Sequence, residues 1–223
     1  MNYLPAIEME SEQKANAAVI WLHGLGASGD DFAAIVPALG LSKQADTNMQ
    51  IRFVFPHAPV IPISINGGME MPAWYDILSI DVQRKINQQQ FMTSAQQVKD
   101  LIERELDRGI SSERIVVAGF SQGGAVAYQA ALNFEQPLAG LMALSTYVAS
   151  PDTIDLKECN QQLPVMIFHG SEDNVVPEAL GHLALSQIQA LGLKPEYKQY
   201  VMGHSVSPRQ IKDMAEFIAR VLA

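Results

Sequence analysis

One five-residue segment constrains the fold of this chain more than any other: Gly-Phe-Ser-Gln-Gly, residues 119–123. It follows the apolar, β-branched run 114–118 and precedes a helix-forming run. A serine between a strand and a helix occupies a sharp, strained turn, and a side chain at Gly119 or Gly123 would collide with neighbouring backbone. The turn holds the hydroxyl clear of the sheet and near the N–H groups that begin the helix. Ser121 is therefore predicted to be a nucleophile.

Length and composition favour one globular domain spanning 1–223. The chain has 223 residues, of which 48% are hydrophobic and 17% charged, enough to bury roughly 70 to 75% of the unfolded surface. Apolar runs stay shorter than the roughly 18 residues of a membrane span. Glu8, Glu10 and Glu12 stand where a secretory signal would carry basic residues. The lone Cys159 has no partner for an internal disulfide, so a cytoplasmic protein is expected.

The charge balance argues against nucleic acid as a partner. The chain carries 15 Lys and Arg against 24 Asp and Glu, a formal net charge of −9, which repels phosphate backbones and anionic membrane surfaces. At most transient contact with a membrane surface is expected. We find no block of like charges, low-complexity tract or long repeat.

Strand-like and helix-like segments alternate along the chain. The expected strands are apolar runs, at 17–22, 51–55, 114–118, 138–144, 163–168 and 196–202. The expected helices run from Asp30 or Asp31 to Leu39, from an N-cap at Thr93 or Ser94 to Gly109, from 124 onward, and over 178–191 and 208–222. Residues 57–87 are expected to be a long irregular segment with a functional role.

Such alternation predicts an α/β fold with a mostly parallel central sheet and helices on both faces. Functional groups in this kind of fold gather at the carboxyl ends of the strands. The loops after the predicted strands are therefore the places to look for the groups that would activate Ser121.

A serine hydroxyl needs a base, and the base needs an acid that fixes its tautomer. In this fold the acid and then the histidine follow the serine along the chain. His204 comes just after a predicted strand, where a loop can bring its imidazole over the serine, and it is the predicted base. His182 lies within a predicted helix and is interpreted as a surface histidine.

The acid is predicted to be Asp173, which lies in the loop directly after the strand that ends at residue 168. Glu172 is its nearest competitor, and Asp152 and Asp155 are more distant ones; these three are interpreted as solvated loop charges.

Two backbone N–H groups are expected to stabilise the oxyanion that forms during acyl transfer. One belongs to the residue after the nucleophile, Gln122, and the other to the loop after an early strand, where Leu25 lies in a glycine-rich segment. That segment lacks the spacing and the lysine of phosphate-binding loops. His23, His57 and His169 show no metal-binding spacing and are interpreted as scaffold residues.

Taken together, these motifs resemble the acyl-protein thioesterase and type II carboxylesterase group of α/β-hydrolases, which includes small lysophospholipase-like enzymes. The matching segments are Leu22-His23-Gly24-Leu25-Gly26, Phe55-Pro56-His57-Ala58-Pro59, Trp74-Tyr75-Asp76-Ile77, Gly119 to Gly124, His169-Gly170 with Asp173 and Val176-Pro177, and Gly203-His204-Ser205. The resemblance implies a triad of Ser121, Asp173 and His204, oxyanion donors at Leu25 and Gln122, and no cofactor or metal. Ala27 departs from the acidic residue that many members carry there.

The resemblance also implies that residues 57–87 border an acyl-chain groove. This segment supplies apolar and flexible side chains that suit an irregular ligand, and the residues predicted to hold the acyl tail are Ile63, Ile65, Met69, Met71, Trp74 and Leu78. The alternative is that they pack the loop onto the core. Exposed apolar residues here are also compatible with a membrane surface or with a second copy of the chain, as in a homodimer.

The sequence therefore predicts a serine hydrolase that cleaves carboxylic esters of short or medium chain or thioesters. The substrate would be a small-molecule or lipid acyl ester, with S-acylated protein and lysophospholipid as candidates. A catalytically silent α/β-hydrolase that binds an acyl chain or a protein is the alternative. A dehalogenase is disfavoured because its chemistry needs a carboxylate in the place of Ser121.

Overall fold

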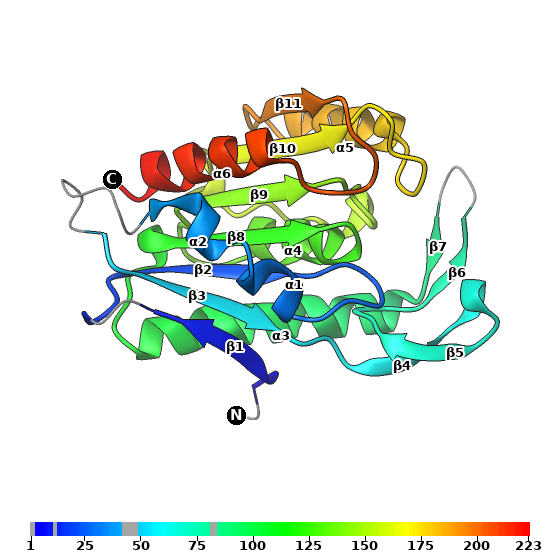
Figure 1. Cartoon of the computed structure of the whole chain (residues 1–223), viewed down its shortest axis with the longest axis horizontal. Helices are drawn as coiled ribbons and strands as arrows, with labels where there is room; N and C mark the ends of the chain where they lie inside the picture. Colours follow the sequence, from blue (N-terminus) through cyan, green and yellow to red (C-terminus); the bar gives the residue numbers. More distant parts are fainter. Residues whose placement is uncertain (1–2, 11–12, 42–48, 81–83) are drawn as a thin grey trace.

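A seven-stranded sheet forms the centre of the computed structural model (Figure 1). The structure describes the whole chain except residues 1–2, 11–12, 42–48 and 81–83. In spatial order the strands are β1 (Ala6–Met9), β3 (Ile51–Pro56), β2 (Ala17–Leu22), β8 (Ile115–Phe120), β9 (Gly140–Leu144), β10 (Val165–Gly170) and β11 (Glu196–Tyr200). All neighbours pair in parallel except β1 and β3, which are antiparallel. The predicted fold class is confirmed.

Apolar runs form the central strands because both faces of the sheet are covered. Every residue of β2, β3, β9 and β10 is buried, as expected for a parallel sheet between two layers of helices. The edge strand β1 was not predicted, because it is only four residues long, is only half-buried and contains the charged Glu8.

Within the described residues, six α-helices cover the sheet: α1 (Asp30–Ala33), α2 (Val36–Leu39), α3 (Gln88–Asp107), α4 (Gln122–Leu132), α5 (Glu178–Ala190) and α6 (Pro208–Val221). One core cluster joins the sheet to α3, α4 and α5, and a second joins its other face to α1, α2 and α6. Short 3-10 helices lie at Ser64–Asn66, Ser112–Arg114, Pro151–Thr153 and Glu158–Asn160. Among the described residues, no helix has the length and apolar character to cross a membrane.

Two predicted helix boundaries were wrong. The helix expected from Asp30 to Leu39 is divided into α1 and α2, because Pro37 lacks the N–H that a continuous helix needs and clashes with the preceding turn. Helix α3 begins at Gln88 rather than after Thr93 or Ser94. The Asn87 side chain caps it by accepting a hydrogen bond from the Gln90 N–H.

The segment expected to be irregular is instead built from two hairpins. Strands β4 (Val60–Ile63) and β5 (Met69–Pro72) form one, and β6 (Ile77–Ser79) and β7 (Lys85–Ile86) form the other. Both lie beyond one end of the central sheet (Figure 1). Gly67 and Gly68 have positive φ angles of 66° and 81° at the first turn, a backbone that glycine adopts without cost. The prolines and the short strands hid this pattern in the sequence.

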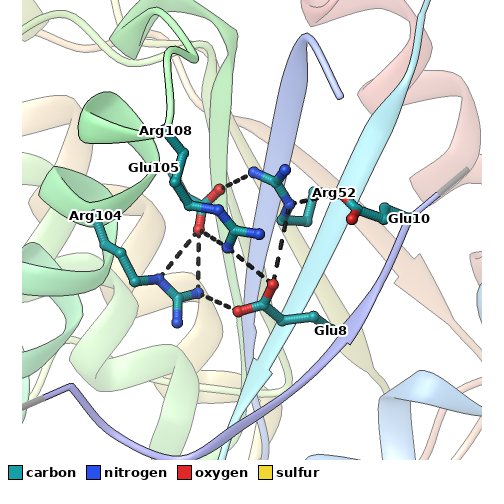
Figure 2. Close-up of polar contacts among 6 residues, drawn as sticks. All are labelled: Glu8, Glu10, Arg52, Arg104, Glu105 and Arg108. Carbon is teal, nitrogen blue, oxygen red and sulfur yellow. Dashed lines mark hydrogen bonds and ion pairs between the residues drawn. The ribbon is translucent and has the colours of Figure 1, made fainter. Parts of the chain in front are cut away.

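A cluster of three glutamates and three arginines fixes the edge strand and helix α3 to the sheet (Figure 2); its members are Glu8, Glu10, Arg52, Arg104, Glu105 and Arg108. Glu105 lies at its centre with a side chain that is 0% exposed. Its two carboxylate oxygens lie 2.6 Å from Arg52 Nη1, 3.1 Å from Arg104 Nη2 and 3.0 Å from Arg108 Nη1. A carboxylate buried in this way is stable only while these cations accompany it.

Glu8 and Glu10 extend the cluster to the edge strand. Glu8 contacts Arg104 at 2.9 Å and Arg108 at 2.8 Å, and Glu10 contacts Arg52 at 2.8 Å. Because Arg52 lies at the amino end of β3, the cluster sits at the opposite end of the sheet from the carboxyl ends of the parallel strands.

Replacing Glu105 with Gln removes the buried charge on which three arginines converge. We expect the free energy of unfolding to fall by about 3 kcal/mol, because the arginines lose their buried partner. Urea unfolding followed by circular dichroism measures this loss. Glu10→Gln makes the same chemical change at a side chain that is 45% exposed and should cost less than about 1 kcal/mol. Equal losses in the two variants would show that Glu105 is not the centre of the cluster.

Candidate active site

Ser121 occupies the turn between β8 and α4 in a backbone conformation that L-residues rarely adopt. Its φ is 52° and its ψ is −120°. Two hydrogen bonds hold this conformation: the Ser121 N–H donates to Leu144 O at 2.9 Å, and the Thr146 hydroxyl donates to Ser121 O at 2.6 Å. The flanking glycines are required by space, since a Cβ on Gly119 would overlap the Gly123 carbonyl and one on Gly123 would overlap the His23 carbonyl. The turn predicted from the sequence is present.

Asp173 and His204 lie in contact, although 31 residues separate them in the chain. Asp173 follows β10 and His204 follows the neighbouring strand β11, so parallel pairing brings the two loops together. His204 Nδ1 lies 2.7 Å from Asp173 Oδ2. An ionised carboxylate only accepts hydrogen bonds, so the proton belongs on Nδ1 and Nε2 is left as an acceptor. The imidazole also packs on the Phe120 ring at 4.6 Å between ring centroids.

The loop after β10 fixes the Asp173 carboxylate. Asp173 Oδ1 accepts the N–H groups of Val175 at 2.9 Å and Val176 at 2.8 Å, which leaves Oδ2 for His204. The adjacent Glu172 is exposed, as are the more distant candidates Asp152 and Asp155. Of the acids weighed from the sequence, Asp173 is the one that contacts His204.

A cavity of about 580 Å³ lies over the carboxyl ends of the strands and brings together Ser121, His204, Leu25 and Gln122. Its other walls come from the loop after β2, from α1, from the two hairpins and from the loops after β9, β10 and β11. These lining residues are mostly apolar and include Ala27, Phe32, Ile35, Ile65, Ile77, Ile80, Phe120, Tyr147, Val175 and Val206, with Asp31 and Arg84 as the charged members.

Only one of the six residues predicted to hold an acyl tail lines this cavity, namely Ile65. Ile63 and Trp74 are buried in the core at 0% and 1% exposure, and Met69 and Leu78 are exposed at 65% and 49%. Met71 packs against Gly26 and accepts a weak hydrogen bond from Asn66. The segment predicted to border a groove does contribute to the cavity, but five of the six side chains named from the sequence do not line it.

Several cavity residues were missed by sequence reasoning because they come from separate segments. Phe32 and Ile35 belong to the α1–α2 region, Tyr147 to the loop after β9, and Val175 and Val206 to the loops around Asp173 and His204. The sequence signal that could have identified these cavity residues is their position in segments that follow a predicted strand. The carboxyl ends of parallel strands meet at one edge of the sheet, so these segments lie together.

Leu25 and Gln122, the two residues predicted to donate to an oxyanion, both line the cavity. Gln122 is the first residue of α4, where no carbonyl of the same helix can accept its N–H. Its side chain is fixed as well: Oε1 accepts the Trp74 N–H at 2.8 Å and Nε2 donates to Tyr75 O at 2.7 Å. Leu25 is followed by Gly26, whose N–H donates to Pro72 O at 2.8 Å.

His23 holds the loop that carries Leu25. Its Nδ1 lies 2.7 Å from Gly24 O, and its Nε2 accepts the Ala58 N–H at 3.1 Å. Both contacts require the neutral ring with its proton on Nδ1, and burial lowers the pKa of His23 below the usual 6.5 in accord with this. The loop is thereby connected to the first residues after β3.

His169 and His57 are also structural. His169 Nε2 donates to Val176 O at 2.8 Å, and burial lowers its pKa below 6.5 although the nearby Asp173 acts in the opposite direction. His57 Nδ1 accepts the Gly29 N–H at 3.2 Å. Within the described part of the chain, no group of three or more His, Cys, Asp or Glu residues is placed to hold a metal ion.

Comparison with known proteins finds one family whose model matches almost the whole chain. A family model described as Phospholipase/Carboxylesterase matches residues 4–222. The chain is 38% identical over 216 residues to the acyl-protein thioesterase 1 of Gibberella zeae, covering 92% of this chain and 91% of that protein. It is 34% identical to the acyl-protein thioesterase 1 of Saccharomyces cerevisiae, with 95% of both chains covered.

Solved structures show the same fold. The crystal structure of Arabidopsis thaliana SOBER1 superposes with a TM-score of 0.82 at 29% identity, covering 94% of this chain and all of that one. The crystal structure of Zea mays acyl-protein thioesterase 2 also gives a TM-score of 0.82, at 23% identity and with 99% of this chain and 100% of that chain covered.

We expect stability to fall on acidification through His169. Burial lowers the pKa of this imidazole in the folded chain, so the unfolded chain binds more protons below about pH 6.5. The contribution of the neutral His169 to the free energy of unfolding is complete above about pH 6.5. It is lost as the pH falls, by at most about 1.4 kcal/mol per pH unit for one proton. In His169→Gln, which retains a donor for Val176 O, the free energy of unfolding should decline less between pH 7.5 and 5.5.

The matched control is His182→Gln, because His182 is an α5 histidine with a side chain that is 56% exposed. Urea unfolding at a series of pH values should give His182→Gln the same pH dependence as the wild type. An equally steep decline in His169→Gln would mean that the burial of His169 does not govern the acid sensitivity.

Proposed function

The chain belongs to the phospholipase/carboxylesterase family of hydrolases, and from this premise we propose that it cleaves acyl esters and thioesters through a covalent acyl-serine intermediate. One observation carries the proposal: the Asp173–His204 contact of 2.7 Å opens onto the same cavity as Ser121 in its strained turn. A nucleophile, a base and an acid that fixes the tautomer of the base are the groups that this chemistry needs.

In the first half-reaction, His204 Nε2 takes the proton of the Ser121 hydroxyl while Ser121 Oγ attacks the carbonyl carbon. The Nδ1 proton stays in its hydrogen bond to Asp173, whose charge stabilises the imidazolium that forms. The tetrahedral intermediate then collapses, and His204 gives its proton to the departing alcohol or thiol.

The oxyanion of the tetrahedral intermediate rests on the N–H groups of Leu25 and Gln122. Both residues line the cavity beside Ser121. The Gln122 N–H is the first of α4, so the positive end of the helix dipole adds to its effect. The loss of one such donor typically costs about 100- to 1000-fold in kcat.

In the second half-reaction, water replaces the leaving group. His204 removes a proton from the water, which attacks the acyl-serine carbonyl through the same oxyanion site, and the carboxylic acid is released as Ser121 recovers its proton. The two half-reactions use the same residues in the same roles.

The acylated cysteine of a protein is the substrate that we propose first, because the curated relatives at 32 to 38% identity are named acyl-protein thioesterase 1. Thiolate is a good leaving group, so the enzyme's main task with such a substrate is to place the carbonyl and stabilise the oxyanion. Lysophospholipids and small carboxylic esters pass through the same tetrahedral intermediate and differ in the leaving group. The mostly apolar cavity suits the acyl part of all three.

Ser121→Ala tests the nucleophile. A fluorophosphonate probe should label the wild type and leave Ser121→Ala unlabelled, and hydrolysis of 4-nitrophenyl butyrate should fall by at least about 10⁴-fold, as expected when a triad nucleophile is removed. Ser205→Ala is a matched control, since Ser205 also lines the cavity and should keep its labelling. Labelling that survives in Ser121→Ala would move the nucleophile elsewhere.

Asp173→Asn tests the acid. The amide can turn its NH₂ group toward His204 and favour the wrong tautomer, so we expect kcat to fall by about 10⁴-fold with little change in KM. Glu172→Gln makes the same chemical change at the adjacent, exposed side chain and should retain wild-type kinetics. Steady-state hydrolysis of a 4-nitrophenyl ester measures both, and a normal kcat in Asp173→Asn would remove this residue from the triad.

A further inference from the structure

The catalytic cavity adjoins a second hollow, and the same two residues line both. The second hollow has a volume of about 680 Å³ and lies between the loop after β9 and helix α5. Arg84 and Tyr147 are the residues that it shares with the cavity of Ser121. We call Arg84 and Tyr147, which lie at the boundary of both spaces, the wall between them.

The second hollow has the lining of a site for an apolar chain. Five of its ten lining residues are apolar, namely Val148, Ala149, Pro151, Leu180 and Leu183, while Arg84, Lys85, Asp152 and Gln187 are polar. Leu183 is 49% exposed and so offers apolar surface to a chain that enters the hollow.

Arg84 is held in the wall by two contacts. Its Nη2 donates to Val175 O at 2.5 Å, and its guanidinium carbon lies 5.0 Å from the centre of the Tyr147 ring. Tyr147 is fixed in turn, since its hydroxyl lies 2.9 Å from the Tyr75 hydroxyl and both rings are buried. The wall thus has a defined position.

We propose that the second hollow is an extension site for the distal methylene groups of a long acyl chain, and that Arg84 closes it and sets the upper limit of acyl length. This inference rests on the proposed function, because it assumes that an acyl chain occupies the cavity beside Ser121. A methyl terminus that reaches Arg84 meets a side chain that is held in place by its hydrogen bond to Val175 O and its contact with the Tyr147 ring. The volume of this side chain blocks the passage, and moving it aside would break the hydrogen bond to Val175 O without replacing it.

Removing the Arg84 side chain should join the two spaces. Each methylene group that then leaves water for the apolar hollow favours binding by roughly fourfold. Several additional groups would become buried in a long acyl chain, whereas a short chain ends before it reaches the wall. The change should therefore appear as altered chain-length preference rather than as a uniform change in rate.

The experiment compares the wild type, Arg84→Ala and Arg84→Met on 4-nitrophenyl esters with acyl chains of C2, C4, C8, C12 and C16, each below its critical micelle concentration. For each variant, kcat/KM is divided by its own value on the acetate ester. Arg84→Ala should raise this ratio for C12 and C16 by at least about tenfold. Arg84→Met keeps the length of the side chain without its charge, and its ratio should rise by less than about threefold.

A second pair of variants tests where the long chain lies. Leu183→Asp puts a charge into the second hollow, so it should cancel the gain when combined with Arg84→Ala and leave the chain-length profile unchanged on its own. If Arg84→Ala folds poorly, Arg84→Gln replaces it, because glutamine is shorter than arginine and uncharged. We expect its C12 and C16 ratios to rise by an intermediate amount.

Three results would overturn the inference: a wild-type profile in Arg84→Ala and Arg84→Gln, a full gain in Arg84→Met, or a gain that survives Leu183→Asp. A full gain in Arg84→Met would assign the effect to charge instead of volume. Fluorophosphonate labelling of every variant separates these results from the proposed function. A labelled Arg84→Ala with the wild-type profile refutes only the extension site, whereas an unlabelled and inactive wild type refutes both.

Discussion

The backbone of Ser121 is the constraint on which the arrangement of the site depends. A residue held at φ 52° and ψ −120° costs about 1–3 kcal/mol and persists only where its surroundings fix it. Strand β9 and the loop after it supply that support, through Leu144 O and the Thr146 hydroxyl respectively. Because α4 starts immediately after this turn, the same support also fixes Gln122, the first residue of α4, next to Ser121.

The buried ion-pair cluster and the proposed catalytic residues lie at opposite ends of the parallel strands. The buried Glu105 and its arginines lie at the amino end of β3 (Figure 2), whereas Ser121, Asp173 and His204 follow the carboxyl ends of β8, β10 and β11. The neutral histidines His23 and His169 fix loops at the catalytic end without adding charge there. A buried ion pair next to the nucleophile would compete electrostatically with the His204–Asp173 pair during proton transfer.

The sequence was sufficient to predict the features that depend on residues close together in the chain. Buried strands are continuous apolar runs, the turn at Ser121 has its glycines, and the fold class follows from the alternation of strands and helices. The acyl-groove residues were different, because which side of a hairpin faces inward depends on register and on the partner surface. Ile63 ends β4 and is buried in the core, whereas Ile65 lies in the 3-10 turn Ser64–Asn66 that follows and lines the cavity. Glu105 lies in α3 next to Arg104 and three residues before Arg108, but its third partner, Arg52 on β3, was not visible from spacing.

The loop after β10 contacts both Asp173 and Arg84. Val175 donates its N–H to Asp173 Oδ1 and accepts a hydrogen bond from Arg84 through its carbonyl. The wall of the second hollow and the carboxylate that fixes His204 therefore share one residue. A substrate that pushes against Arg84 also pushes on the peptide group that holds Asp173, so an acyl chain too long for the cavity would disturb the base as well as bind poorly.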